Sequence, residues 1–145
     1  MVGRRSGLPA VITLDTSGIV AGLNRSDRHH ADAARALAAG RGPTVVPLGI
    51  MAEVAFVLGQ TLGEHATTAF LMGLEHGDSL LDCGDADLPR IRELMSRYVA
   101  LGLGFADAAV LACAERNGGA VLTFDRRGFE VIAREVPISL VPSDA

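Results

Sequence analysis

Strand-like and helix-like segments alternate along this chain, and this alternation limits the folds that it can adopt. Short runs rich in β-branched and apolar residues predict five strands, near Ala10–Leu14, Thr44–Pro47, Ser79–Asp82, Ala120–Phe124 and Ile138–Val141. The first three begin about 35 residues apart, which matches the length of a β-α-β crossover. We therefore expect an α/β fold with a mainly parallel sheet and helices on both of its faces.

Helical patterns fill the intervals between these runs. The predicted helices cover Ala31–Ala39 after an N-cap at Asp27 and before Gly40, then Leu48–Leu58, a segment from Gly63 to Leu74, Leu88–Ala100 with Pro89 in its first turn, Phe105–Arg116, and a short helix near Gly128–Arg134. The 145 residues are expected to form one domain, 1–145, in which 1–9 are a flexible or short lead.

Composition excludes several classes of protein. No apolar run is long enough for a membrane span, and the N-terminus lacks the apolar core of a signal peptide, so we expect a cytoplasmic protein. Cys83 and Cys113 are too few for a disulfide framework or a zinc site, and we expect both thiols to be buried. All 13 basic residues are arginine. The absence of lysine excludes P-loop phosphate binding and Schiff-base chemistry.

Four carboxylates each stand almost alone in an otherwise uncharged stretch: Asp15, Glu53, Asp107 and Asp125. Burying an unpaired carboxylate is unfavourable, so we expect a cationic partner, and a divalent metal ion is the commonest choice. The formal net charge is −4, from 13 basic and 17 acidic residues, so without these four acids the chain is balanced at 13 against 13. Any affinity for nucleic acid must then come from a local group of arginines.

The predicted topology brings these acids together. Asp15 and Asp125 end the first and fourth strands, and the carboxyl ends of parallel strands share one edge of the sheet. Glu53 and Asp107 lie in the first turns of helices, each on an apolar stripe that is expected to face the core. We therefore expect one pocket that contains all four side chains.

Each acid also has an ordinary explanation on its own. Asp15 could cap a helix that starts near Thr16, and Asp107 could be a first-turn acid stabilised by the helix dipole. Glu53 could form a structural salt bridge with an arginine, and Asp125 could be a turn residue paired with one. The joint position of the four favours a shared site over these separate explanations.

Electrostatics predicts the ligand of such a pocket. Two carboxylates about 5 Å apart repel by on the order of 3 kcal/mol at an effective dielectric constant near 20. A set of oxygen ligands favours Mg²⁺, with Mn²⁺ as a substitute, because zinc usually recruits His or Cys. We expect Asp15 and Asp107 to be direct ligands and Glu53 and Asp125 to act through water or a second ion.

Other polar residues flank the expected site. The hydroxyls of Thr16, Ser17 and Thr123 are candidates for hydrogen bonds to the carboxylates, to water or to a phosphate, or for ordinary capping and turn roles. The arginines Arg126 and Arg127, and also Arg25 and Arg28, are candidates to anchor phosphates, although a surface ion pair is the commoner role of an arginine. We expect His29 and His30 to lie on a solvated helix outside the site. The chemistry that this set supports is metal-assisted hydrolysis of a phosphodiester bond.

The fragments that carry the acids resemble the signature of the PIN-domain family, most closely the VapC-type toxin ribonucleases of bacterial toxin–antitoxin pairs. They are Leu14-Asp-Thr-Ser, Met51-Ala-Glu-Val, Gly104-Phe-Ala-Asp-Ala and Leu122-Thr-Phe-Asp-Arg-Arg. The resemblance implies a three-layer α/β/α fold with a five-stranded parallel sheet, and Mg²⁺-dependent endonucleolytic cleavage of tRNA, rRNA or mRNA at the acidic site. It also implies a homodimer and an antitoxin protein that inserts into that site.

Two alternatives remain distinct from this interpretation. One is a non-catalytic RNA-binding or assembly module on the same fold. The other is a phospho-acceptor receiver domain, which needs a lysine near its acidic pocket, and this chain has none. The few aromatic residues, 4% of the chain, favour recognition of RNA shape and backbone over extensive base stacking.

Overall fold

Five parallel strands form the central sheet of the computed structural model, which describes residues 10–143; the predicted lead, residues 1–9, lies outside them. The strands are β1 (Ile12–Leu14), β2 (Thr44–Pro47), β3 (Leu80–Asp82), β4 (Ala120–Leu122) and β5 (Ser139–Val141). Their order is β3-β2-β1-β4-β5, and every neighbouring pair is parallel. In the central strand, Thr13 lies opposite Val45 of β2 and Val121 of β4.

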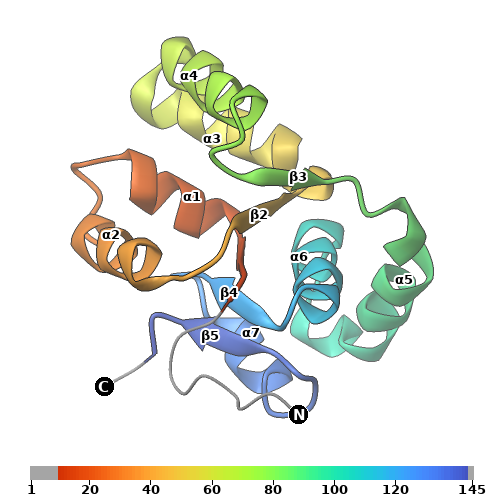
Figure 1. The fold of residues 1–145 in the computed structure, drawn as a ribbon. Coiled ribbons are helices and arrows are strands. Elements are labelled where there is room, and N and C mark those ends of the chain that lie inside the picture. The colour runs from red at the N-terminus through yellow and green to blue at the C-terminus, as the bar shows by residue number, and fades with distance from the viewer. Residues whose placement is uncertain (1–9, 144–145) are drawn as a thin grey trace.

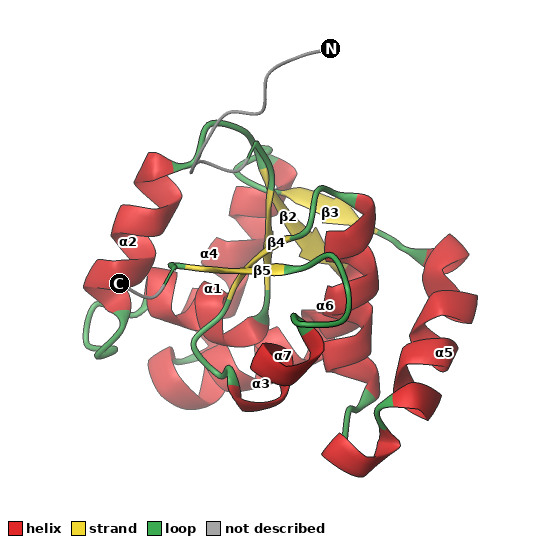
Figure 2. Cartoon of the chain, turned by 90° about the horizontal axis from the view of Figure 1, so that it is seen from below, coloured by secondary structure: helices red, strands yellow, loops and turns green. Residues whose placement is uncertain are grey.

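Seven α-helices accompany these strands in the described part of the chain. They are α1 (Thr16–Leu23), α2 (His30–Ala39), α3 (Met51–Leu62), α4 (Glu64–Glu75), α5 (Leu88–Arg97), α6 (Phe105–Arg116) and α7 (Arg127–Ile132), with 3-10 turns at Leu48–Ile50, Asp85–Asp87 and Val99–Leu101. Helices α1 and α2 lie on one side of the sheet and α5 and α6 on the other, as the views in Figure 1 and Figure 2 show. The predicted three-layer α/β/α fold is confirmed. None of the helices within 10–143 is both long and apolar enough to cross a bilayer.

Burial explains why β1 and α6 form the centre of the molecule. All three residues of β1 are buried, as expected for a strand covered on both faces. Seven consecutive residues of α6, Ala108 to Ala114, are also buried, and four of them are alanines. Small side chains let this helix approach β1 and β4 closely, and α6 contacts both strands as well as α5. The first turn of α6 is thereby fixed beside the carboxyl end of β1.

Several predicted boundaries are wrong in detail. Asp27 does not cap α2, because the helix begins at His30 after His29, and the Asp27 carboxylate instead accepts the backbone N–H of His29 at 2.8 Å. The predicted helix from Leu48 starts with a 3-10 turn and becomes α-helical only at Met51. The predicted helix to Ala100 ends at Arg97 and is followed by a separate 3-10 turn.

The prediction of two buried thiols is also wrong in part. Cys113 is buried in α6, whereas Cys83 is exposed just after the edge strand β3. An edge strand has only one neighbour in the sheet, so the residues that follow it receive less cover.

Gly18 allows α1 to pack closely against β4. A β-carbon at this position would lie 2.5 Å from the backbone oxygen of Leu122, which no side-chain rotation can relieve. We expect Gly18→Ala to lower the free energy of unfolding by roughly 1–3 kcal/mol, because the helix or the strand must shift to admit the methyl group. Urea denaturation followed by circular dichroism measures this change.

The matched control is Gly59→Ala in the interior of α3, where an added β-carbon would meet no atom within 4 Å. This variant is expected to gain about 1 kcal/mol, since alanine is the better helix former. Equal stability changes in the two variants would contradict the close packing of α1 on β4.

Candidate active site

The four isolated acids line a single pocket at the carboxyl ends of β1 and β4. The pocket has a volume of about 320 Å³, and its walls include Asp15, Glu53, Asp107 and Asp125. Strand β1 lies between β2 and β4, so the connections after β1 and β4 run in opposite directions along the sheet. Ligands of open α/β sheets bind at such a switch point.

Asp15 is the deepest of these acids. It follows β1 directly, is 6% exposed, and caps α1 by accepting the backbone N–H of Gly18 at 2.8 Å. The hydroxyl of Ser17 donates to the same oxygen at 2.8 Å. Burial raises the pKa of Asp15 to about 6; hydrogen bonds from Thr123, Gly18 and Ser17 limit the rise, and the charge of Asp107 adds to it. The capping role proposed for Asp15 is therefore real, and it coexists with a place in the pocket.

The other three acids border the pocket and keep contact with solvent. Glu53 and Asp107 do not face the core as predicted: both are exposed, at the margin of their helices' buried stripes. The Thr16 hydroxyl donates to Glu53 Oε1 at 2.5 Å. The surrounding protein still desolvates Asp107, and this desolvation raises its pKa, with further contributions from the charges of Glu53 and Asp125.

No ion pair between residues 10–143 includes any of these four acids. Within the described residues, neither a structural salt bridge of Glu53 nor a pairing of Asp125 with an arginine is therefore found. The backbone N–H of Asp125 bonds to Thr123 Oγ1 at 3.3 Å, so a hydroxyl contributes to the geometry of that turn.

A network of hydroxyls connects the ends of the two strands. Ser17 Oγ donates to Asp15, accepts the backbone N–H of Phe124 at 2.9 Å, and lies 3.4 Å from Thr123 Oγ1. The Thr123 side chain is fully buried. The hydroxyls predicted from the sequence thus hold the acids and the backbone around them in place.

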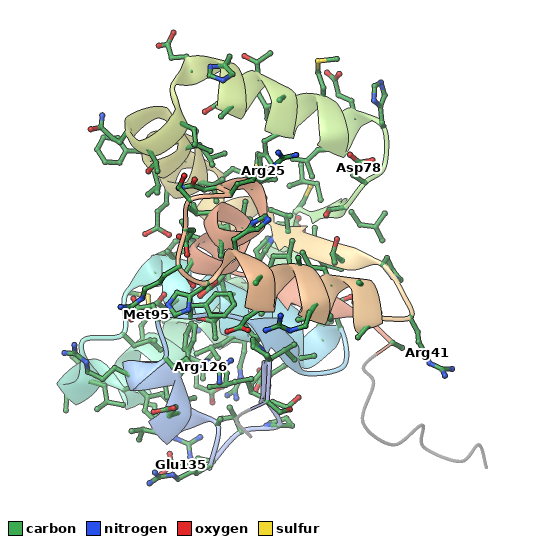
Figure 3. All side chains as sticks on the ribbon, turned by 90° about the vertical axis from the view of Figure 1, so that its left-hand side faces the viewer. Arg25, Arg41, Asp78, Met95, Arg126 and Glu135 are labelled. Carbon is green, nitrogen blue, oxygen red and sulfur yellow. The ribbon has the colours of Figure 1, made fainter. Side chains whose placement is uncertain are left out.

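The four candidate arginines do not line the pocket. Arg126 donates from Nε to the carbonyl of Thr123 at 2.9 Å and from Nη2 to that of Pro142 at 2.5 Å, so it connects the β4–α7 turn to the segment after β5. Arg127 is exposed at the start of α7, and Arg25 and Arg28 are exposed in the α1–α2 connection. Arg25 and Arg126 lie well apart in Figure 3. Contact of these arginines with phosphate stays a prediction.

Three polar or aromatic residues of the pocket escaped the sequence prediction: Asp27, His29 and Phe124. His29 does not lie on a solvated helix, because it precedes α2 and its ring stacks on Phe124 with centroids 4.5 Å apart and planes inclined by 11°. Phe124 is next to Asp125 in sequence and could have been considered for that reason. Nothing in the sequence indicates that the α1–α2 connection folds back over the end of β4.

The donor set of the pocket fits a hard divalent cation. Carboxylate and hydroxyl oxygens are the ligands that Mg²⁺ and Mn²⁺ prefer. In the described part of the chain, no three His, Cys, Asp or Glu side chains are grouped so as to hold an ion by themselves. Such a set suits an ion that keeps several of its own waters, as Mg²⁺ does.

Comparison with known proteins gives consistent results. The sequence model of the PIN domain family matches residues 12–135 of this chain. The ribonuclease VapC26 of Mycobacterium tuberculosis is 28% identical over 121 residues, which cover 82% of this chain and 90% of that protein.

Three solved structures share the fold. The crystal structure of M. tuberculosis VapC20, described as a toxin that cleaves the sarcin–ricin loop, superposes with a TM-score of 0.74 at 23% identity, covering 83% of this chain and 94% of that one. VapBC2 of Rickettsia felis, bound to a DNA fragment from its promoter, gives a TM-score of 0.67 at 16% identity and covers 92% and 99% of the two chains. The FitAcB structure of Neisseria gonorrhoeae gives 0.57 at 18% identity, with 89% and 95% covered.

Ionisation of Asp15 should destabilise the metal-free protein. Between its unfolded pKa of 3.8 and its folded pKa of about 6, the folded state retains a proton that the unfolded state releases, so stability is lost as pH rises through 6. Asp15→Asn mimics the protonated form. At pH 8 in EDTA we expect it to exceed the wild type in free energy of unfolding by about 2 to 3 kcal/mol. Near pH 4 the difference should largely vanish, as measured by urea denaturation.

The control is Glu64→Gln, which changes an exposed acid of α4 outside the pocket. Its effect on stability should be small at both pH values. If the free energy of unfolding of the wild type rose relative to that of Asp15→Asn between pH 4 and pH 8, the result would contradict the buried position of this carboxylate.

Proposed function

This chain belongs to the PIN domain family, and from that premise we propose that it is a Mg²⁺-dependent endoribonuclease, the toxin of a VapC-type toxin–antitoxin pair. The observation that carries the proposal is that the four isolated carboxylates line one pocket and that none of them forms an ion pair among residues 10–143. The named activity of the VapC26 relative supports it, since this chain spans nine-tenths of that protein. The substrate is proposed to be tRNA, rRNA or mRNA.

Asp15 and Asp107 are the proposed direct ligands of the ion, with Glu53 and Asp125 acting through water or a second ion. A bound Mg²⁺ supplies an activated water and stabilises the charge of the leaving oxygen. The chain's own contribution is orientation. The Gly18 amide and the Ser17 hydroxyl fix one oxygen of Asp15, and Thr16 holds Glu53, so the carboxylates need little rearrangement to act together.

The acidic pocket also supports a proposal about partners. An antitoxin that presents a cationic side chain to the pocket would compensate the same carboxylates and block access of RNA. The likeness to VapBC2 of Rickettsia felis, which was solved bound to promoter DNA, supports an antitoxin partner. We propose a homodimeric toxin silenced by a cognate antitoxin in this way.

Replacing the proposed ligands should abolish cleavage but preserve the fold. For Asp15→Asn and Asp107→Asn we expect the rate of RNA cleavage to fall by about 100-fold or more, beyond the typical effect of losing a residue that only supports metal ligands. Fluorescence anisotropy with labelled RNA should show that binding is largely retained, and Glu64→Gln should cleave like the wild type. The assay uses total RNA followed by mapping of the new ends.

The outcomes separate the candidate functions. Cleavage that persists in both Asn variants would exclude the acidic pocket as the active site. RNA binding by a wild type that never cleaves in Mg²⁺ would favour a non-catalytic RNA-binding or assembly module.

Ion binding can be measured apart from activity. Isothermal titration of the wild type with Mn²⁺ should show saturable binding, and Asp15→Asn should show none. The ion should also raise the thermal midpoint of the wild type alone, because a ligand of the folded state stabilises it by about 2.7 kcal/mol at 100 times its dissociation constant. Equal heats and equal midpoints for the two proteins would refute this site.

A further inference from the structure

Two stacked rings form part of the wall of the acidic pocket. His29 comes from the connection between α1 and α2, and Phe124 comes from the turn after β4. Their centroids are 4.5 Å apart with an interplanar angle of 11°, and both residues are partly exposed. The five phenylalanines and the single tyrosine all lie within the described residues 10–143, and of these six only Phe124 lines this pocket.

Both rings are held by the groups that shape the acidic site. The backbone N–H of Phe124 donates to Ser17 Oγ at 2.9 Å, and the same hydroxyl donates to Asp15 at 2.8 Å. On the other side, Asp27 accepts the backbone N–H of His29 at 2.8 Å, and Arg28 Nε donates to His29 Nε2 at 3.2 Å. One residue, Ser17, therefore connects the deepest acid to the backbone of Phe124, on which the His29 ring stacks.

The charge of the chain limits how the pocket can attract RNA. The net charge of the chain is −4, and five carboxylates line the pocket itself, so Coulomb attraction there is unavailable without a cation. Stacking of a base on an aromatic face does not depend on charge, and proteins that bind single-stranded RNA use it widely. The His29–Phe124 pair is the aromatic surface that the pocket offers.

We propose that the His29–Phe124 pair binds RNA by stacking against the base of a nucleotide next to the scissile phosphate. This inference rests on the proposed ribonuclease function and adds a binding surface to it. Stacking tolerates different bases, so the pair positions the strand and contributes only modest sequence preference. It supplements recognition of the RNA backbone with a single aromatic contact at the site of cleavage.

The test uses a short RNA that contains a cleavage site mapped with the wild-type protein. His29→Ala and Phe124→Leu should each raise KM by about 10-fold, within the range typical of losing one stacked base, and should change kcat less. His29→Phe should restore most of the loss, because it keeps an aromatic ring at the position. The matched controls are His76→Ala and Phe56→Leu, two exposed residues that do not line the pocket and should leave both constants unchanged.

A double-mutant cycle with the substrate identifies the contact. The RNA is prepared with an abasic nucleotide on either side of the scissile phosphate. For one of these two RNAs, the missing base should reduce the affinity of the wild type as much as Phe124→Leu reduces the affinity for intact RNA. The same missing base should cause no further loss of affinity in Phe124→Leu. The deficit of Phe124→Leu should also be nearly independent of salt concentration, unlike the loss caused by removing an arginine–phosphate contact.

Failure of the stacking inference can be distinguished from failure of the proposed ribonuclease function. A wild type that does not cleave RNA refutes the ribonuclease assignment, and the stacking inference with it. If the wild type cleaves RNA, two results would refute the stacking inference and leave the ribonuclease assignment intact. One is that Phe124→Leu and the abasic nucleotide reduce affinity additively on both abasic RNAs. The other is that KM is unchanged in both His29→Ala and Phe124→Leu. If one variant fails to fold, as judged by circular dichroism, the other variant and the abasic RNAs still decide the question.

Discussion

The buried carboxylate of Asp15 is the constraint on which the rest of the site depends. It ends the central strand, caps α1 through the Gly18 amide, and its backbone N–H donates to the Leu122 carbonyl of β4 at 3.3 Å. One residue thereby joins a strand, a helix and the neighbouring strand. Its pKa of about 6 shows that burial outweighs the hydrogen bonds that favour the charged form. A buried carboxylate with a raised pKa lowers the stability of the fold at neutral pH. Groups with such shifted pKa values are typical of functional sites.

The topology of the sheet converts this local feature into a pocket. Because β1, β2 and β4 are parallel, the segments that follow these strands all begin at the same edge of the sheet. Helix α6 reaches that edge from the opposite layer, and its alanines let it approach β1 and β4 closely enough to place Asp107 beside Asp15. The acids come from four separate segments of the chain, so only the completed sheet can assemble them.

The sequence predicts the regular part of this structure and the identity of the acids, because both depend on local patterns. The five strands follow from short runs of β-branched and apolar residues, and the acids stand out against uncharged neighbours. The exposure of Glu53 is harder to foresee, because helical periodicity shows which face of a helix is apolar but not where on that face burial ends. His29 escapes prediction because its position depends on how an irregular connection folds over a strand 90 residues later in the chain. The role of Arg126 is equally hard to predict, because it donates hydrogen bonds to two backbone carbonyls that only the tertiary structure brings near it.

The distribution of arginine distinguishes structural acids from those of the pocket. Arg116 bonds to Asp82 and Asp87, and it lowers the pKa of Asp82, whereas burial and neighbouring acids raise the pKa of Asp15 and Asp107. Arg90 similarly connects Glu93 and Glu115 on the α5–α6 side of the sheet. Within residues 10–143, then, acids that stabilise helix packing have a cation of the chain itself and the pocket acids have none. In the function proposed above, a metal ion and a cationic group of the antitoxin would compensate the same carboxylates. The two would then compete for one site, and the antitoxin would silence the protein without any change in its fold.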